Sequence, residues 1–308
     1  MINYVILLLA NIIFIFFLYA TVGYTEHHPD GITLAYYACD KSQPLIGNGG
    51  FLKIYEIFIN CESPNIPYLG VIILNSIMLI YGIYLFHLNI YKKIHFIVLF
   101  ISLTFYIYSI FFPSKEIILS IAMLAIVATK SAPQRIFLVL IISIIRPIYS
   151  LLFFARFFRS IKARLFLFIG FFIVINAISS GLLGEESKNF YDSKASEYEG
   201  KAKIIFDSLS IAAPLIRIFW NFLGLPGSIL NIYNEFSWHI FAHLGTQLVL
   251  IVLFFYFIKI LFKKHISKNE SLIILFVVLT ATFPLPHTRY LYPIIFPLIY
   301  LIINKHNR

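Results

Sequence analysis

The sequence predicts an all-α membrane protein, a polytopic bundle of about eight to ten transmembrane segments in one domain over residues 1–308. Its 308 residues are 60% hydrophobic and only 12% charged, and the mean hydropathy is +0.88. Soluble domains of this size carry roughly twice that share of charge. The apolar runs are long and continuous rather than alternating, which favours helices over an outer-membrane barrel.

Residues 1–129 predict four spans and one large loop. Residues 4–22 are long enough to cross a bilayer, and they lack the basic start and cleavage site of a signal peptide. Residues 23–67, a segment with several acidic side chains, form the first predicted periplasmic loop. Within it the amphipathic stretch 51–59 suits an interfacial helix. Residues 68–88, 94–112 and 117–129 then predict three further spans, the last of them short.

Basic residues flank the segment 136–157 at both of its ends. Both ends are therefore expected in the cytoplasm, which a single span does not allow. Arg146 precedes Pro147 at the middle of this stretch, and the residue before a proline avoids helical geometry. We expect two half-helices, 136–145 and 148–157, that form a re-entrant hairpin with Arg146 at its tip. A single span with two basic flanks is the alternative.

The second half of the chain predicts one more large loop and four spans. Residues 165–183 cross outward and lead into residues 184–236, the second predicted periplasmic loop. Pro and Gly interrupt the apolar part of that loop, which favours interfacial helices. Residues 238–262, 272–283 and 293–303 complete the bundle.

Basic residues indicate the orientation. The net charge is +10, and its distribution suits the positive-inside rule better than nucleic-acid binding, so both termini are expected in the cytoplasm. Cys39 and Cys61 then fall in the periplasmic loop, where a disulfide is permitted; two free thiols are the alternative. More than half of the Lys and Arg residues lie at predicted cytoplasmic helix ends: Lys92, Lys93, Lys130, Arg135, Arg156, Arg159, Lys162, Arg164, Lys259, Lys263, Lys264, Lys268, Lys305 and Arg308.

Four cations from separate segments gather on the predicted outer side. Guanidinium and ammonium groups in a partly dry site suit a diphosphate, and ionisable groups at membrane depth are functional candidates. The alternative is that each pairs with a local acid or reaches to lipid headgroups. These candidate diphosphate ligands are Lys115, Arg146, Arg217 and Arg289.

Asp30, Glu116 and His287 are the candidate catalytic residues. Each is an outer-side group able to take a proton from an acceptor hydroxyl. His239 and His243 share a helix face, but no third ligand accompanies them, so we expect no metal site and no other cofactor. Nucleotide-binding, zinc-protease and serine-hydrolase motifs are absent from the sequence.

The chain resembles the Wzy and EpsG group of bacterial polysaccharide polymerases, which are related in layout to GT-C glycosyltransferases. The resemblance rests on a combination that spans most of the chain. Its parts are a first helix followed by a loop with Asp30 and a surface helix, the turn PSKE at residues 113–116, IIRPIYS around Arg146, a large loop around Arg217, and HTRYLYP at residues 287–293. The paired acids of the GT-C motif are missing around Asp30.

The resemblance implies an enzyme of the bacterial inner membrane with a periplasmic active site. It would join repeat units carried on undecaprenyl diphosphate, for O-antigen (lipopolysaccharide) or capsule, with membrane lipids and a chain-length regulator as further partners. The alternatives are a GT-C enzyme that adds single sugars from a polyprenyl phosphate, a sugar or lipid flippase with a broken helix around Arg146, and a non-catalytic scaffold.

Overall fold

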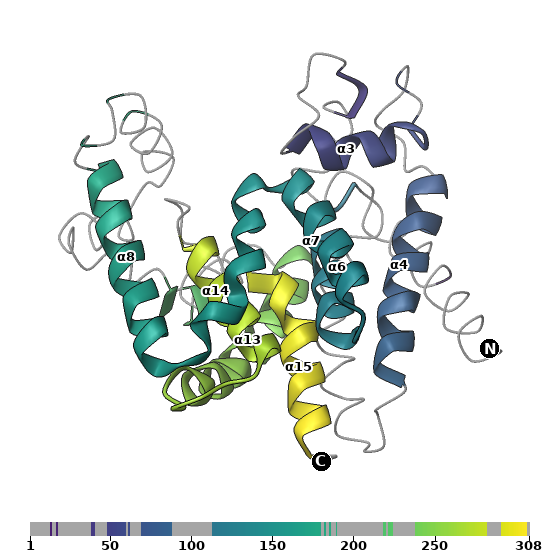
Figure 1. Cartoon of the computed structure of the whole chain (residues 1–308). Coiled ribbons are helices and arrows are strands. Elements are labelled where there is room, and N and C mark those ends of the chain that lie inside the picture. The colour runs from purple at the N-terminus through teal and green to yellow at the C-terminus, as the bar shows by residue number, and fades with distance from the viewer. Residues whose placement is uncertain are drawn as a thin grey trace. The chain divides into compact units, whose positions relative to one another are not determined.

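The regular structure of the chain is helical (Figure 1). The computed structural model describes residues 13, 17, 38–40, 48–59, 61, 69–87, 113–179, 182, 185, 189, 218–219, 221–223, 238–281 and 291–306. Within these residues no strand is present, and the only β-type pairing is an isolated bridge between Ser160 and His265. The all-α prediction is therefore confirmed for the part of the chain that is described.

Nine helices are described, and most coincide with predicted segments. Predicted boundaries agree closely at α4 and α13, whereas α6 and α14 begin two to four residues earlier than the apolar runs because polar N-terminal turns precede them. The helices are α3 (Asn48–Glu56), α4 (Leu69–His87), α6 (Lys115–Ala128), α7 (Ala132–Ile145), the 3-10 helix η2 (Pro147–Arg159), α8 (Ile161–Ser179), α13 (Trp238–Leu261), α14 (Lys268–Thr280) and α15 (Tyr292–His306).

The segment around Arg146 is broken where the sequence predicts a break. Helix α7 ends at Ile145, and Arg146 leaves helical geometry with φ −142° and ψ 105°. The second half-helix is a 3-10 helix rather than an α-helix, with non-helical torsions at Phe158. Whether η2 returns to the side from which α7 came remains a prediction, because η2 passes from one compact unit of the chain into the other.

Two helices are long and apolar enough to cross a membrane. These stretches are Ile161–Ile178 in α8 and Leu244–Leu261 in α13, and shorter apolar helices occur at Leu69–Leu85, Ala132–Ile145 and Tyr292–Ile303. Only the described residues contribute to this finding, so most of the expected eight to ten spans remain predictions. Ile13 and Phe17, within the first predicted span, are helical and exposed.

The chain divides into two compact units. Unit 1 contains Met1–Ser150, Leu225–Val249 and Tyr292–Arg308, and unit 2 contains Leu151–Gly224 and Leu250–Leu291. Each unit has its own apolar core. The single membrane domain of the sequence analysis remains a prediction.

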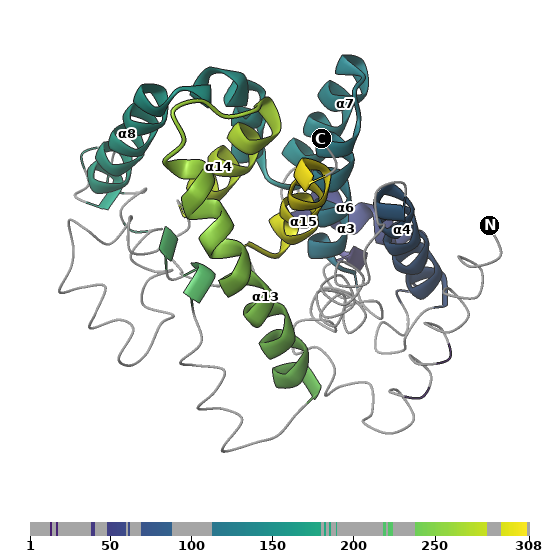
Figure 2. The same ribbon diagram turned by 90° about the horizontal axis from the view of Figure 1, so that it is seen from below.

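Helix α6 is the centre of unit 1. It packs against α4, α7 and α15, and Figures 1 and 2 both show it between α4 and α15. Every residue from Glu116 to Val127 is buried. Gly82 lets α4 approach α6 closely, because a Cβ there would overlap Cδ1 of Ile121. A short helix enclosed by neighbours needs no polar face, which explains why its sequence after Glu116 is apolar except for Ser120.

Unit 2 combines an enclosed helix with a largely exposed one. Helix α14 is buried along its whole length from Glu270 to Thr280. In the apolar stretch of α8, by contrast, only 17% of the residues are buried. The exposed residues on α8 include Leu165 and Phe166, which are 61% and 74% exposed. Such an apolar surface is unfavourable in water and suits a lipid environment.

Candidate functional site

The start of α6 gathers polar side chains from several elements of unit 1. Short loops make packed helices antiparallel neighbours, and only residues 129–131 separate α6 from α7, which pack together. The end of α7 therefore lies at the same end of the bundle as the start of α6. Helix α3 contacts α7 and lies over this end (Figure 1). We define the α6 N-terminal cluster as Tyr55, Asn75, Ser114, Lys115, Glu116 and Arg146.

Helix α3 reaches this cluster because one of its faces is apolar. Leu52 and Tyr55, three residues apart in α3, are buried, whereas Ile54 on another face of the helix is 41% exposed. Ile59, just after the helix, is also buried. An i, i+3 ion pair between Lys53 and Glu56 stabilises the helix on its solvent side. The amphipathic helix predicted at residues 51–59 is thus present, three residues earlier in the chain.

The hydroxyl of Tyr55 joins three helices. It donates a hydrogen bond to Oδ1 of Asn75 in α4 at 2.5 Å, and the carbonyl oxygen of Ser114 lies 3.4 Å from it. Burial raises the pKa of Tyr55; the hydrogen bond to Ser114 opposes that effect, and the negative charge of Glu116 adds to it. The phenol therefore stays protonated and acts as a donor.

Lys115 and Glu116 occupy the first turn of α6. Ser114 is the N-cap, and its hydroxyl accepts a hydrogen bond of 3.4 Å from the Ile117 amide. Glu116 is only 8% exposed, and a carboxylate in the first turn is favoured by the helix dipole. A half-buried Lys115 precedes it directly. The sequence placed these two candidates together, and the structure adds that the carboxylate is buried.

Arg146 is the C-cap of α7 and is half-buried. Its amide donates to the carbonyl of Ile142 at 2.9 Å, and Pro147 then prevents the helix from continuing. Cations near a helix C-terminus are favoured by the dipole. The structure therefore brings Arg146 to the same end of unit 1 as Lys115 and Glu116.

The other four candidates cannot be placed. Asp30, Arg217, His287 and Arg289 lie outside the described residues. Their roles remain predictions from the sequence.

A disulfide flanks helix α3. Cys39 and Cys61 are bonded, with their Cα atoms 5.5 Å apart, so the pairing offered by the sequence is the one observed. The bond closes a segment with a sequence separation of 22 that contains the whole of α3. It therefore restrains the element that covers the cluster.

Sequence reasoning missed Tyr55 and Asn75. Both are fully buried, and a signal existed for Asn75, because an amide in an otherwise apolar span must find a hydrogen-bond partner. For Tyr55 the signal was its place on the apolar face of an amphipathic stretch. Neither pattern identifies the partner helix.

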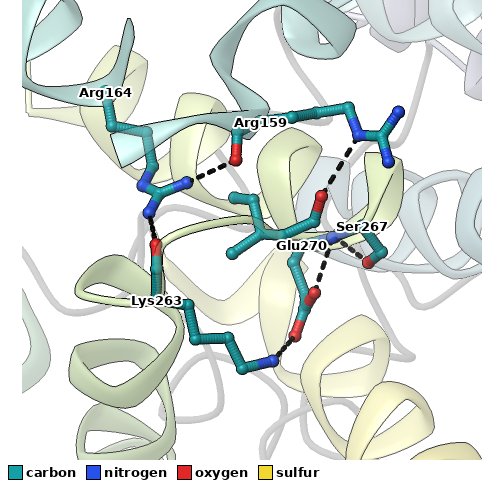
Figure 3. A network of polar contacts seen from close by, with 6 residues as sticks. Arg159, Arg164, Lys263, Ser267 and Glu270 are labelled. Carbon is teal, nitrogen blue, oxygen red and sulfur yellow. Dashed lines mark hydrogen bonds and ion pairs between the residues drawn. The ribbon is translucent and has the colours of Figure 1, made fainter. Parts of the chain in front are cut away.

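A second polar network, in unit 2, joins the start of α8 to the end of α13 and the turn after it (Figure 3). Arg164 is 1% exposed, and its guanidinium donates to three carbonyl oxygens: Leu261 at 3.0 Å, Arg159 at 2.8 Å, and Lys263. Two of these carbonyls lie at the C-terminal end of α13 and in the turn after it, where helical partners are missing. The placement of Arg164 at a cytoplasmic helix end remains a prediction, and the structure adds that its guanidinium caps the end of α13.

Backbone hydrogen bonds join the same two segments. The Ile161 amide donates to Lys264 at 3.1 Å, and the Ile266 amide donates to Arg159 at 3.0 Å. We call the paired segments, residues 156–164 and 259–270, the basic clasp. It joins the start of α8 to the turn between α13 and α14.

The carboxylate of Glu270 stabilises the turn between α13 and α14 within the basic clasp. It accepts from Nζ of Lys263 at 2.7 Å and from the Ser267 amide at 2.8 Å, and Ser267 caps α14 in return. This is a reciprocal capping box. Burial alone would raise the pKa of Glu270, but the hydrogen bonds from Lys263 and Ser267 outweigh it, and the pKa falls below its ordinary value.

Among the described residues, no group of three His, Cys, Asp or Glu side chains is arranged to hold a metal ion. Comparisons with protein-family models, curated proteins and solved structures find no match for this chain.

Proposed function

We propose that the chain is an integral membrane glycosyltransferase that polymerises lipid-linked oligosaccharide repeat units at the extracytoplasmic face. The observation that carries the proposal is the α6 N-terminal cluster. It combines a buried carboxylate, Glu116, with two cations, Lys115 and Arg146, at one end of a helical bundle.

Membrane placement is supported by the exposed apolar surface of α8. A core helix of a soluble protein passes the same length and hydropathy test, but it is mostly buried, and the apolar stretch of α8 is not. The disulfide adds support, because such bonds persist in oxidising compartments. It supports an extracytoplasmic location for the α3 end of unit 1.

The cluster has the groups that glycosyl transfer requires. A carboxylate at Glu116 would accept the proton of the acceptor hydroxyl while its oxygen bonds to the anomeric carbon of the donor. The bond from that carbon to the diphosphate breaks, and the leaving diphosphate takes the electron pair. Lys115 and Arg146 would stabilise the negative charge that develops on it. No metal ion is required for this balance.

The test is polymerisation by purified protein with a lipid-linked repeat unit as donor and acceptor. Glu116→Gln removes the base but keeps the shape, and Arg146→Ala removes a cation; each is expected to lower the yield of polymer at least about 100-fold. Glu185→Gln, an exposed acid, and Arg135→Ala, at the opposite end of α7, serve as matched controls. Polymer from both cluster variants at the control rate would refute the proposal.

Transport is the second candidate, because the helix break at Arg146 is a feature of substrate paths in transporters. A strain that lacks the protein distinguishes the two. Surface glycan limited to one repeat unit supports polymerisation, whereas repeat units retained on the cytoplasmic side support transport. Transfer of one sugar without a ladder of products would indicate the single-sugar GT-C enzyme instead.

A further inference from the structure

We propose that the basic clasp of unit 2 binds the anionic phospholipid headgroups of the cytoplasmic leaflet, and so anchors the ends of two transmembrane helices. This inference rests on the membrane placement above and goes beyond the proposed reaction.

The clasp lies at the ends of both candidate spans. The apolar stretch of α8 begins at Ile161, and that of α13 ends at Leu261. Ile161 donates its amide to Lys264, and Arg164 caps Leu261, so the two helix ends are fixed to each other. In a bilayer these ends meet the headgroup layer together.

The clasp carries an excess of positive charge. Glu270 is its single acid, and Lys263 already neutralises that carboxylate at 2.7 Å. Within the described part of the chain, none of the remaining cations on the clasp has a carboxylate within ion-pair distance. These exposed cations are Arg156, Arg159, Lys162, Lys259, Lys264 and Lys268.

Apolar side chains stand exposed beside these cations. Phe157 is 57% exposed, Phe262 is 69% exposed and Ile161 is 41% exposed. The guanidinium of Arg156 lies 4.9 Å from the centre of the Phe157 ring, an attractive cation–π arrangement. A soluble polyanion would engage the cations alone, whereas an anionic leaflet offers acyl chains to the rings and phosphates to the cations.

The paired backbone gives the clasp a defined geometry. Arg159 donates from Nε to the carbonyl of Ile266 at 3.1 Å, and the Ser160–His265 bridge lies beside this contact. Lys162 and Lys264 therefore extend from segments held against each other. Preorganised cations lose less conformational freedom when they bind a headgroup.

The test measures binding of phosphatidylglycerol to the full-length protein in phosphatidylcholine–detergent micelles. Each basic residue near a membrane surface contributes about fivefold in affinity, so Lys162→Gln, Lys264→Gln and Lys268→Gln together are expected to weaken binding about 100-fold. A matched triple variant, Lys188→Gln, Lys194→Gln and Lys201→Gln in the predicted outer loop, changes the net charge equally and should bind as the unchanged protein does.

Two further arms keep the test decisive. Replacement of the same three clasp lysines by Arg should leave lipid binding unchanged, because the charge is kept. Lys264→Gln alone should weaken binding about fivefold. This single variant provides the test if the triple Gln variant does not fold. Equal losses in the clasp and loop variants, or no loss in either, would overturn the proposal. So would release of the lipid by millimolar pyrophosphate, which would indicate a site for soluble polyanions. None of these readouts depends on polymer formation, so they are independent of the test of the proposed function.

Discussion

The hydroxyl of Tyr55 lies 2.5 Å from Oδ1 of Asn75, and this hydrogen bond joins the surface helix α3 to the apolar helix α4. Both residues are fully buried. The bond belongs to the same cluster as Glu116, whose charge acts on the phenol. Its removal should therefore affect both the attachment of α3 and the cluster beneath it.

We expect Tyr55→Phe to lower the free energy of unfolding by about 1–3 kcal/mol, because it removes a donor from a buried amide oxygen. Thermal unfolding of the purified protein in detergent measures this change. Tyr81→Phe is the control, since Tyr81 is 48% exposed, and it should be neutral within about 0.5 kcal/mol. Equal melting temperatures for the two variants would contradict the role given to Tyr55.

Arg164→Met should be among the most destabilising changes in unit 2. The substitution leaves the carbonyls of Leu261, Arg159 and Lys263 without their donor, and loss of a buried charged donor costs about 3–5 kcal/mol. Arg164→Lys keeps the charge but not the planar fork, so it should rescue only part of this loss. Arg156→Met, at an exposed position, should cost far less in the same unfolding assay.

Acid should weaken the basic clasp through Glu270. Its folded pKa lies below the ordinary value of 4.5, so the carboxylate contributes stability that is fully present above pH 4.5 and is lost as the pH falls through the folded pKa. Glu270→Gln should be less stable than the unchanged protein at pH 7. The difference in melting temperature between the two should shrink on acidification below pH 4.5, and a constant difference would argue against this contribution.

Reduction of the disulfide should loosen α3. A cross-link across a sequence separation of 22 is worth about 3 kcal/mol in the chain-entropy model. Dithiothreitol should therefore lower the melting temperature of the unchanged protein to that of the double variant Cys39→Ser, Cys61→Ser. The double variant itself should not respond to the reductant, which controls for other effects of dithiothreitol.

Reporter fusions test the predicted orientation. A periplasm-active reporter after Glu199 and a cytoplasm-active reporter after Lys162 should both give signal, because all of α8 (Ile161–Ser179) after its second residue lies between the two points. The exchanged reporters at the same positions should be silent. Signal from the exchanged pair would reverse the orientation and would move the basic clasp to the outer face.

The helices were predictable because each depends on a local pattern. Helix α4 occupies Leu69–His87, where a long and largely apolar run predicts a span, and the break after Ile145 follows from the proline at position 147. The 3-10 geometry of η2 was not predictable, because the apolar spacing suits an α-helix equally well. That geometry depends on contacts that the local sequence does not contain.

Part of each polar site was visible in the sequence, but the partners were not. Glu116 and Arg146 were recognised because charge is costly at membrane depth. Arg164 was counted with ordinary basic flanks, yet it is buried against carbonyls that lie 97 and 99 residues away in the chain. A pattern of residue types along the chain does not reveal contacts over such separations.

The enclosure of α6 has a consequence for how a lipid-borne sugar would enter. Fourteen residues of α-helix rise about 21 Å, roughly 9 Å less than the thickness of a hydrocarbon layer. In the proposed membrane placement, with the C-terminal end of α6 level with the inner boundary of that layer, Glu116 would lie below the outer boundary, recessed within the membrane. A lipid-linked diphosphate that diffuses in laterally, with its lipid tail still among the acyl chains, would reach that depth without leaving the bilayer.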